Sequence, residues 1–173
     1  MIPLKEVLIS LGSNLGDRVG NIKKGIELLS SLPFKIEAIS SLYETPPVGF
    51  ESQNRFINAA LIGRTSLSPF ALLVEIKKIE ALLGRKIIKK PFFYEDRKID
   101  IDIIFYENEI IKTTVLMIPH PLAHLRAFVL KPACEIAPFW VHPILKVPLE
   151  CLYLRLKKLN NLPTMINRGK IVL

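Results

Sequence analysis

Hydrophobic and polar residues follow two different periods along the chain, and these periods predict the order of its elements. Short runs of apolar residues are typical of buried strands, and here they occupy residues 6–12, 34–44, 55–65 and 99–106. Apolar residues recur every three or four positions over 18–31 and 69–83, the spacing of amphipathic helices. Ser68 and Pro69 suit the start of the second helix, and Gly84 suits its end. The pattern therefore predicts the order β-α-β-β-α-β.

This order is that of the split βαβ, or ferredoxin-like, arrangement, in which helices pack on an antiparallel sheet. We therefore predict an α+β fold whose ferredoxin-like βαββαβ core is complete within the first 106 residues. The remainder adds a C-terminal embellishment, with a short strand near 109–111 and a short helix over 149–159. The chain shows no repeat or clear linker, so we expect residues 1–173 to form one domain, in which 140–173 are a C-terminal extension without an assigned role.

Composition narrows the class of protein without choosing a function. Half of the residues are hydrophobic, and no apolar run approaches the roughly 20 residues of a membrane span. Lys5 and Glu6 stand where a signal peptide needs an apolar stretch, so we expect a cytoplasmic protein that does not associate with membranes. Cys134 and Cys151 are too few for a disulfide framework. The net charge of +8 favours an anionic partner, whether nucleic acid, a phosphorylated metabolite or acidic lipid.

Two aspartates interrupt the last apolar run, "KIDIDIIFY". Asp is among the poorest strand formers, and the alternation along a strand places Asp100 and Asp102 on one face, where their charges repel. One interpretation is a solvated face on an edge strand. The other is a magnesium site, because Mg²⁺ takes one or two carboxylates together with substrate phosphates. Arg97 would then add a fixed positive charge beside the same site.

The preceding loop, "GRKIIKKPFFYEDRK" over 84–98, mixes basic and aromatic residues. A solvated surface loop is the ordinary interpretation of such a segment. Cations that bind phosphate, next to carboxylates that bind Mg²⁺, are also the parts of a phosphoryl-transfer site. The same mixture suits single-stranded nucleic acid, so the loop alone leaves the alternatives open. The sequence lacks GxxxxGK[ST] and GxGxxG, which excludes a P-loop NTPase and a standard dinucleotide fold.

Two shorter segments complete the candidate chemistry. In "IPHPLAHLRAF", His120 lies between two prolines and could donate to a phosphate, while Arg126 could reach another. A lone loop histidine is more often a surface residue. In "RFIN", Phe56 and Asn58 share a strand face, so a flat ring could stack on the phenylalanine while the amide reads its edge. A core phenylalanine and a hydrogen-bonded asparagine are the alternative interpretation.

With these segments in place, the sequence closely resembles the hydroxymethyl-dihydropterin pyrophosphokinases of folate biosynthesis. The segments that carry the resemblance are "LGSNLGD", "YETPPVG", "FINAAL", "IEALLGR", "DRKIDIDII" and "IPHPLAHLRAFVLKP". The resemblance implies that ATP donates a pyrophosphoryl group to the hydroxymethyl oxygen of the pterin and is released as AMP. It implies ATP and hydroxymethyl-dihydropterin as partners, no nucleic acid, and a monomer. It also implies two Mg²⁺ ions, with Asp100 and Asp102 as their ligands.

The resemblance assigns roles to further residues. Arg97, His120 and Arg126 fall at phosphate-contacting positions, with Arg97 also counted among the catalytic residues. Glu80 lies on the nucleotide side, and Arg85 opens a mobile catalytic loop. The positions that match the lining of the pterin pocket are Thr45, Pro46, Val48, Phe56, Asn58 and Phe128.

The sequence departs from the family where relatives usually write Trp-Gly-Pro-Arg or something near it. Here the segment is "YEDR", so Glu95 and Asp96 place additional negative charge near the phosphates. This departure keeps one alternative in view, a family member that binds its substrates without turnover. The other alternative is an RNA-binding module of the RRM type, which shares the βαββαβ order, although the pattern of glycine and spaced aromatics in its RNP1 strand is absent.

Overall fold

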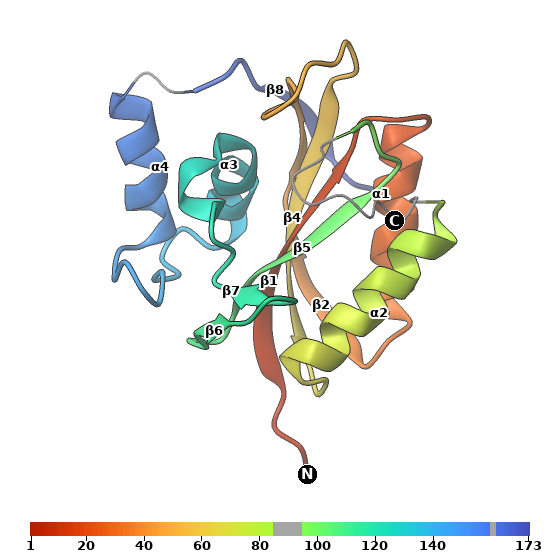
Figure 1. The fold of residues 1–173 in the computed structure, drawn as a ribbon, viewed down its shortest axis with the longest axis vertical. Helices are drawn as coiled ribbons and strands as arrows, with labels where there is room; N and C mark the ends of the chain where they lie inside the picture. Colours follow the sequence, from red (N-terminus) through yellow and green to blue (C-terminus); the bar gives the residue numbers. More distant parts are fainter. Residues whose placement is uncertain (85–94, 160–161) are drawn as a thin grey trace.

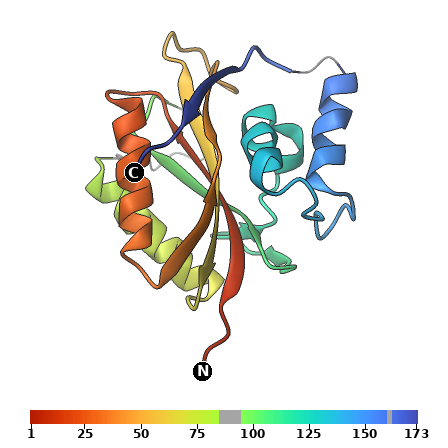
Figure 2. The ribbon, with the colours of Figure 1, turned by 180° about the vertical axis from the view of Figure 1, so that it is seen from behind.

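A computed structural model describes residues 1–84, 95–159 and 162–173 of the chain. A twisted sheet forms its centre, and helices cover both faces (Figures 1 and 2). The strands are β1 (Lys5–Ser13), β2 (Phe34–Ile39), β3 (Ser41–Thr45), β4 (Phe56–Thr65), β5 (Asp100–Tyr106), β6 (Ile111–Lys112), β7 (Met117–Ile118) and β8 (Ile166–Lys170). The helices are α1 (Arg18–Ser30), α2 (Pro69–Leu82), the short 3₁₀ helix η1 (Ala123–Leu125), α3 (Ala127–Ile136) and α4 (Leu149–Lys158).

The main sheet is antiparallel throughout its described pairings. Its order is β5-β1-β4-β3-β8, and β2 pairs with β4 next to β3. β1 and β4 lie in the middle of the sheet and are buried on both faces, which explains why their sequences are almost continuously apolar. The predicted α+β fold with a ferredoxin-like core is therefore confirmed. β6 and β7 form a separate small hairpin.

Both helices of the predicted βαββαβ core form on one face of the sheet, and local capping explains where they begin. Asp17 precedes α1, and its carboxylate accepts a hydrogen bond from the backbone N–H of Gly20. Ser68 precedes α2 and accepts from the N–H of Ala71, with Pro69 in the first turn. The apolar stripes of both helices pack onto the sheet, and their fully or almost fully buried members are Ile22, Ile26, Leu29, Leu72, Ile76 and Ile79.

The structure differs from the sequence prediction at the segment 34–44, which forms two strands. Ser40 lies at the break, where its hydroxyl accepts from the N–H of Ala60 at 2.8 Å and its own N–H donates to the Ala60 carbonyl at 2.9 Å. The side chain thus replaces a backbone acceptor where the strand bends. The pairing with β4 also shifts register between Ile36 and Ala38. The two strands consequently reach different neighbours, because only β3 continues to β8.

The other face of the sheet is covered by α3 and α4, and this layer forms a second core (Figure 1). The predicted helix over 149–159 is confirmed as α4, whose Leu149, Leu152 and Leu156 are buried. The sequence analysis does not predict α3, because Pro132 in its interior reads as a helix breaker. It also does not predict β8, which is exposed along its whole length. In the described part of the chain, none of the helices is long and apolar enough to span a membrane.

Candidate active site

Three neighbouring strands present polar and aromatic side chains on the face that carries α3 and α4. Register places Gly12 opposite both Asn58 and Asp100, and Ser10 opposite Asp102. Side chains alternate along each strand, so the intervening residues Leu11, Ile57 and Ile101 enter the core beneath α1 and α2 instead. Alternation on β5, β1 and β4 therefore assembles one patch from six residues: Ser10, Gly12, Phe56, Asn58, Asp100 and Asp102.

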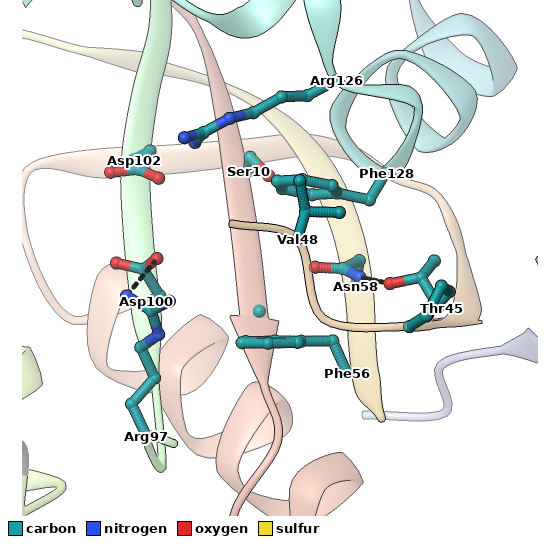
Figure 3. Close-up of a pocket in the computed structure, with 12 residues that line it drawn as sticks. Ser10, Thr45, Val48, Phe56, Asn58, Arg97, Asp100, Asp102, Arg126 and Phe128 are labelled. Atoms are coloured by element: carbon teal, nitrogen blue, oxygen red, sulfur yellow. Dashed lines mark hydrogen bonds and ion pairs between the residues drawn. The ribbon is translucent and has the colours of Figure 1, made fainter. Parts of the chain in front are cut away.

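This patch forms the floor of a cleft, and Figure 3 shows its side chains. The cleft has a volume of about 500 Å³, including the solvent space at its mouth. A cleft of this size suits a small molecule. The lining residues are Ser10, Gly12, Thr45, Pro46, Val48, Phe56, Asn58, Arg97, Asp100, Asp102, Arg126 and Phe128. They come from β1, β3, β4, β5, the loops next to them and the start of α3.

One end of the cleft is acidic. Asp100 and Asp102 are half-buried and project from β5 toward the same space (Figure 3). Burial, together with the charges of Asp100 and Glu80, raises the pKa of Asp102 to about 7, against a lowering by Lys77 and Arg126. The repulsion that the sequence predicts is therefore present. No group of three or more His, Cys, Asp and Glu side chains in the described part of the chain could hold a metal, so a cation here would need further ligands from water or the substrate.

The other end of the cleft is aromatic. The rings of Phe56 and Phe128 lie on opposite sides of the open space, and Asn58 lies between them at the back (Figure 3). Asn58 is 3% exposed, and its Nδ2 donates to the Thr45 hydroxyl at 2.6 Å. That bond directs the amide oxygen of Asn58 toward Gly12, where a Cβ atom would lie 2.9 Å from it. The arrangement offers two ring faces and one acceptor to a flat heterocycle.

Two arginines connect the two ends. Arg97 forms an ion pair with Asp100, with 3.5 Å between Nη1 and Oδ2, and its guanidinium lies over the ring of Phe56 at 5.5 Å from the centroid. Arg126 immediately precedes α3, and its guanidinium lies 5.5 Å from the centroid of Phe128. Each guanidinium thus lies over a ring. Figure 3 shows that both arginine side chains also lie next to the carboxylates.

Two predicted phosphate or nucleotide residues lie outside the lining of this cleft. His120 borders a neighbouring pocket with His124 and His142. Its Nδ1 accepts from the N–H of Leu122 at 3.2 Å, and burial together with Arg126 lowers its pKa to about 4, against the opposing effect of Asp100. His120 is thus neutral near pH 7, with Nε2 as its donor.

Glu80 is 2% exposed and lies in α2 on the opposite side of the sheet. Its Oε1 lies 3.4 Å from the N–H of Ile101 on the edge strand β5 and 3.5 Å from the Lys77 ammonium. Arg85, the predicted first residue of the catalytic loop, lies outside the described residues.

Comparison with known proteins identifies the chain. Residues 8–138 match the family described as 7,8-dihydro-6-hydroxymethylpterin-pyrophosphokinase (HPPK). The chain belongs to the HPPK family. It is similar to the 2-amino-4-hydroxy-6-hydroxymethyldihydropteridine pyrophosphokinase of Aquifex aeolicus, with 45% identity over 85% of this chain and 89% of the relative. It is also similar to the Bacillus subtilis pyrophosphokinase, with 41% identity over 74% of this chain and 75% of the relative.

Longer proteins contain a related segment. The folic acid synthesis protein fol1 of Pneumocystis carinii is 46% identical over 81% of this chain, which spans only 18% of that protein. A solved HPPK-DHPS chain of Plasmodium falciparum shares the fold, with a TM-score of 0.72 at 18% identity. That match covers 92% of this chain and 45% of the solved chain, so this chain spans less than half the length of that protein.

Membership confirms the predicted family and its reaction. The activity of an HPPK is pyrophosphoryl transfer in folate synthesis, and the family uses ATP. This finding decides against the RNA-binding alternative. The geometry also brings together Arg97, Asp100, Asp102, Arg126 and all six predicted pterin-side residues of this HPPK.

Sequence reasoning missed Ser10 and Gly12, which also line the cleft. A signal for both was available. Gly12 belongs to the quoted "LGSNLGD" segment, and alternation along a strand places Ser10 on the same face two residues earlier.

The departure "YEDR" has a definite place in this HPPK. The carboxylate of Asp96 accepts from the Ser52 hydroxyl at 2.6 Å and the Asn14 amide at 2.7 Å, and it is also hydrogen-bonded to the Asn54 amide. The sequence analysis expects this charge to lie near the phosphates. In the structure, both carboxylate oxygens of Asp96 accept from neutral donors of the β1–α1 and β3–β4 loops.

Proposed function

We propose that this cleft is the active site of the chain, with the pterin in its aromatic end and the phosphates of ATP at its acidic end. The observation that carries the proposal is that one cleft contains both paired carboxylates and two opposed rings. The reaction joins the hydroxymethyl group of a flat heterocycle to a highly charged polyphosphate. An enzyme for it needs these two environments next to each other, with cations between them.

The pterin would lie between Phe56 and Phe128. Its 2-amino group and ring N–H are donors, so they suit the oxygen of Asn58, which the hydrogen bond from Nδ2 to Thr45 holds in place. Pro46 and Val48 would cover the remaining edge of the ring. This orientation directs the opposite edge of the pterin, with its hydroxymethyl group, toward Asp100 and Asp102 (Figure 3).

We propose that two Mg²⁺ ions are held by Asp100 and Asp102 together with the phosphates. The residues fit a hard divalent cation, because two carboxylates face one space and the pKa of Asp102 is raised by burial and by neighbouring charge. When bound, such ions would neutralise phosphate charge and polarise the attacking hydroxyl. The coupled carboxylates would then both be ionised, because a cation favours their charged forms.

The chain's own cations would hold the phosphates in line for transfer. Arg97 and Arg126 border the acidic end from opposite sides and would donate to phosphate oxygens. The neutral His120 would donate from Nε2 to a phosphate oxygen. Glu80, next to β5, keeps its predicted place on the nucleotide side. Arg85 keeps its predicted role in the catalytic loop, although it lies outside the described residues.

In the proposed reaction the hydroxymethyl oxygen forms a bond to the β-phosphorus. The bond from that phosphorus to the oxygen bridging the α- and β-phosphates breaks, and AMP leaves with the electron pair. The hydroxyl proton is released to water. Alignment by the aromatic slot and charge stabilisation by the two arginines are the contributions of the chain itself.

Chromatography of nucleotides after incubation with ATP, MgCl₂ and 6-hydroxymethyl-7,8-dihydropterin tests the proposal. We expect AMP in a one-to-one ratio with the pterin pyrophosphate, and none without the pterin. ADP in place of AMP would contradict pyrophosphoryl transfer. Binding of ATP without any AMP would identify a family member that does not turn over.

Replacement of either metal ligand should abolish the reaction. We predict that Asp100→Ala and Asp102→Ala each lower kcat by about 1,000-fold or more, because phosphate charge is then left without its counter-ion. Glu109→Ala is the matched control, since Glu109 is exposed and does not line the cleft. A near-normal rate in either aspartate variant would refute the metal assignment.

A further inference from the structure

Asp96 ties together three segments that are distant in the sequence. One carboxylate oxygen accepts from both Asn14 Nδ2 and Ser52 Oγ, and the other is hydrogen-bonded to Asn54 Nδ2. Asn14 follows β1, Ser52 and Asn54 belong to the loop between β3 and β4, and Asp96 precedes β5. Among the described residues, no strand pairing joins the β3–β4 loop to the segment that precedes β5, and this carboxylate is one of the polar links between them.

Asn14 extends the same network into the backbone. It is 2% exposed, its Oδ1 accepts from the N–H of Arg97 at 2.7 Å, and its own N–H donates to the Arg97 carbonyl at 3.1 Å. Its Nδ2 is also within 3.3 Å of the Asn54 carbonyl. The backbone of Arg97 is thus fixed on both sides by one buried asparagine, whose amide nitrogen is shared by Asp96 and the β3–β4 loop.

The groups held by this network enter the cleft directly. The guanidinium of Arg97 lies 5.9 Å from the ring centroid of Phe50 and 5.5 Å from that of Phe56. Phe50 belongs to the same loop as Ser52, and its ring meets Phe56 edge to face at 6.2 Å. Movement of the β3–β4 loop would therefore displace the support of Phe56 and the cation next to Asp100 at the same time.

The network requires an ionised acceptor. Three donors converge on the carboxylate of Asp96, and a carboxylate can accept at both oxygens. The hydrogen bond from Ser52 has the largest effect on the pKa of Asp96 and lowers it. Burial opposes this, and Asn54, Asn14 and the charge of Arg97 add to the lowering, so the pKa lies below its ordinary value. An amide of the same shape would direct its NH₂ group at another donor, so it could not satisfy all three.

We propose that Asp96 is a positioning residue for the pterin, which holds the β3–β4 loop and Arg97 in the conformation that completes the pterin side of the cleft. The inference rests on the proposed function, because it assigns the aromatic end of the cleft to the pterin. It means that Asp96, part of the "YEDR" departure, supports the pterin side of the cleft. The network fixes the backbone of Arg97, which would also donate to the phosphates, whereas the β3–β4 loop and the rings of Phe50 and Phe56 belong to the pterin side alone. Loss of the network should therefore weaken the binding of both substrates, and that of the pterin more.

The test separates the two substrates. Isothermal titration measures the Kd of 6-hydroxymethylpterin in the presence of Mg²⁺ and a non-hydrolysable ATP analogue, and separately the Kd of the analogue alone. We expect Asp96→Asn to weaken pterin binding by about 10-fold or more, and to raise the Kd of the nucleotide analogue by a clearly smaller factor. In steady-state assays, the KM for the dihydropterin should rise more than kcat falls.

Four further variants serve as controls for the effect of Asp96→Asn on pterin binding. Glu51→Gln makes the same change of charge on an exposed residue of the same loop and should leave both constants unaltered. Asp96→Glu keeps the charge and both acceptors, so it should restore part of the pterin affinity. Ser52→Ala should act in the same direction as Asp96→Asn, and the double variant should show less than the product of the two effects, because both remove one shared contact.

Three outcomes would overturn the inference. Equal losses of pterin and nucleotide affinity would indicate general damage to the fold. If Asp96→Asn lowers the melting temperature but leaves the pterin Kd unchanged at temperatures well below melting, Asp96 has a purely structural role. Absence of pterin binding to the wild-type chain would remove the basis of both proposals. Wild-type pterin binding without AMP formation would refute only the proposed reaction, and the Kd values would still decide the role of Asp96.

Discussion

At the scale of the residue, Gly12 shows how the cleft depends on an absent side chain. Its backbone lies in a regular strand, so the requirement for glycine comes from space and not from backbone conformation. A Cβ atom at this position would lie 2.9 Å from Asn58 Oδ1 and 3.5 Å from the ring of Phe56. The buried hydrogen bond from Asn58 to Thr45 restrains the amide from moving away.

We predict that Gly12→Ala weakens the binding of the pterin, because the amide oxygen that reads its edge must shift. The loss of one well-placed hydrogen bond corresponds to about 1–2 kcal/mol, or about a 10-fold rise in the KM for the pterin. Gly25→Ala is the control, since a Cβ there would meet Ile99 and Leu11 at 3.5 Å and Ile101 at 3.7 Å, which are ordinary contact distances. Steady-state kinetics on both variants checks this, and an unchanged KM in Gly12→Ala would contradict the role of Asn58.

At the scale of the element, Glu135 joins the end of α3 to β3 and β8. Its carboxylate accepts from the backbone N–H and hydroxyl of Ser41 and from the Tyr43 hydroxyl at 2.7 Å, and it forms an ion pair with Lys170. Partial burial acts to raise the pKa of Glu135. The hydrogen bonds from Lys170, Tyr43 and Ser41 outweigh that effect and hold the pKa at about 2.

This shift predicts how stability depends on pH. The folded pKa is depressed below the ordinary value of 4.5, so the contribution of Glu135 is present above about pH 4.5 and is lost as the pH falls toward 2. We expect wild type to exceed Glu135→Gln by about 1 kcal/mol in unfolding free energy near pH 7, allowing for solvent screening. Urea denaturation from pH 7 to pH 2.5 should show this difference shrinking below pH 4.5. A difference that grows in acid would refute the assignment.

At the scale of the whole molecule, the two strands at the ends of the order β5-β1-β4-β3-β8 are protected against pairing with another chain. On β5, the carboxylate of Glu80 lies against the N–H of Ile101. On β8, the exposed Arg168 and Lys170 carry charge, and Gly169 adopts a φ of 87° that interrupts a regular edge. Charged and irregular edges oppose strand addition.

We therefore predict a monomer, as the sequence analysis also expects. Size-exclusion chromatography with light scattering should give a mass near 19.6 kDa over a range of concentrations. Arg168→Thr together with Lys170→Thr would remove the edge charges and should increase any tendency to self-associate. A wild-type mass near twice that of the chain would contradict the prediction.

The sequence by itself was enough to predict the strands and helices of the core, the family and its reaction. Apolar runs and helical spacing predicted β1, β4, β5, α1 and α2, because burial on a regular period leaves a strong local signal. The placement of Asp100 and Asp102 on one face followed from alternation alone. The resemblance supplied the family and the pterin-side residues, which the structure gathers in one cleft.

Only the tertiary structure decided the contacts between segments that are distant in the chain. Phe128 lies opposite Phe56 because α3 packs onto the second face of the sheet. The sequence pattern did not predict α3, since Pro132 lies inside this helix. The tertiary structure also joined Asp96 to Asn14 and Ser52, although 82 and 44 positions separate them. Such contacts leave no period in the sequence, because they depend on which loops the strand order places side by side. The family and its reaction could therefore be predicted from the sequence, whereas the arrangement of the side chains in the cleft depended on the fold.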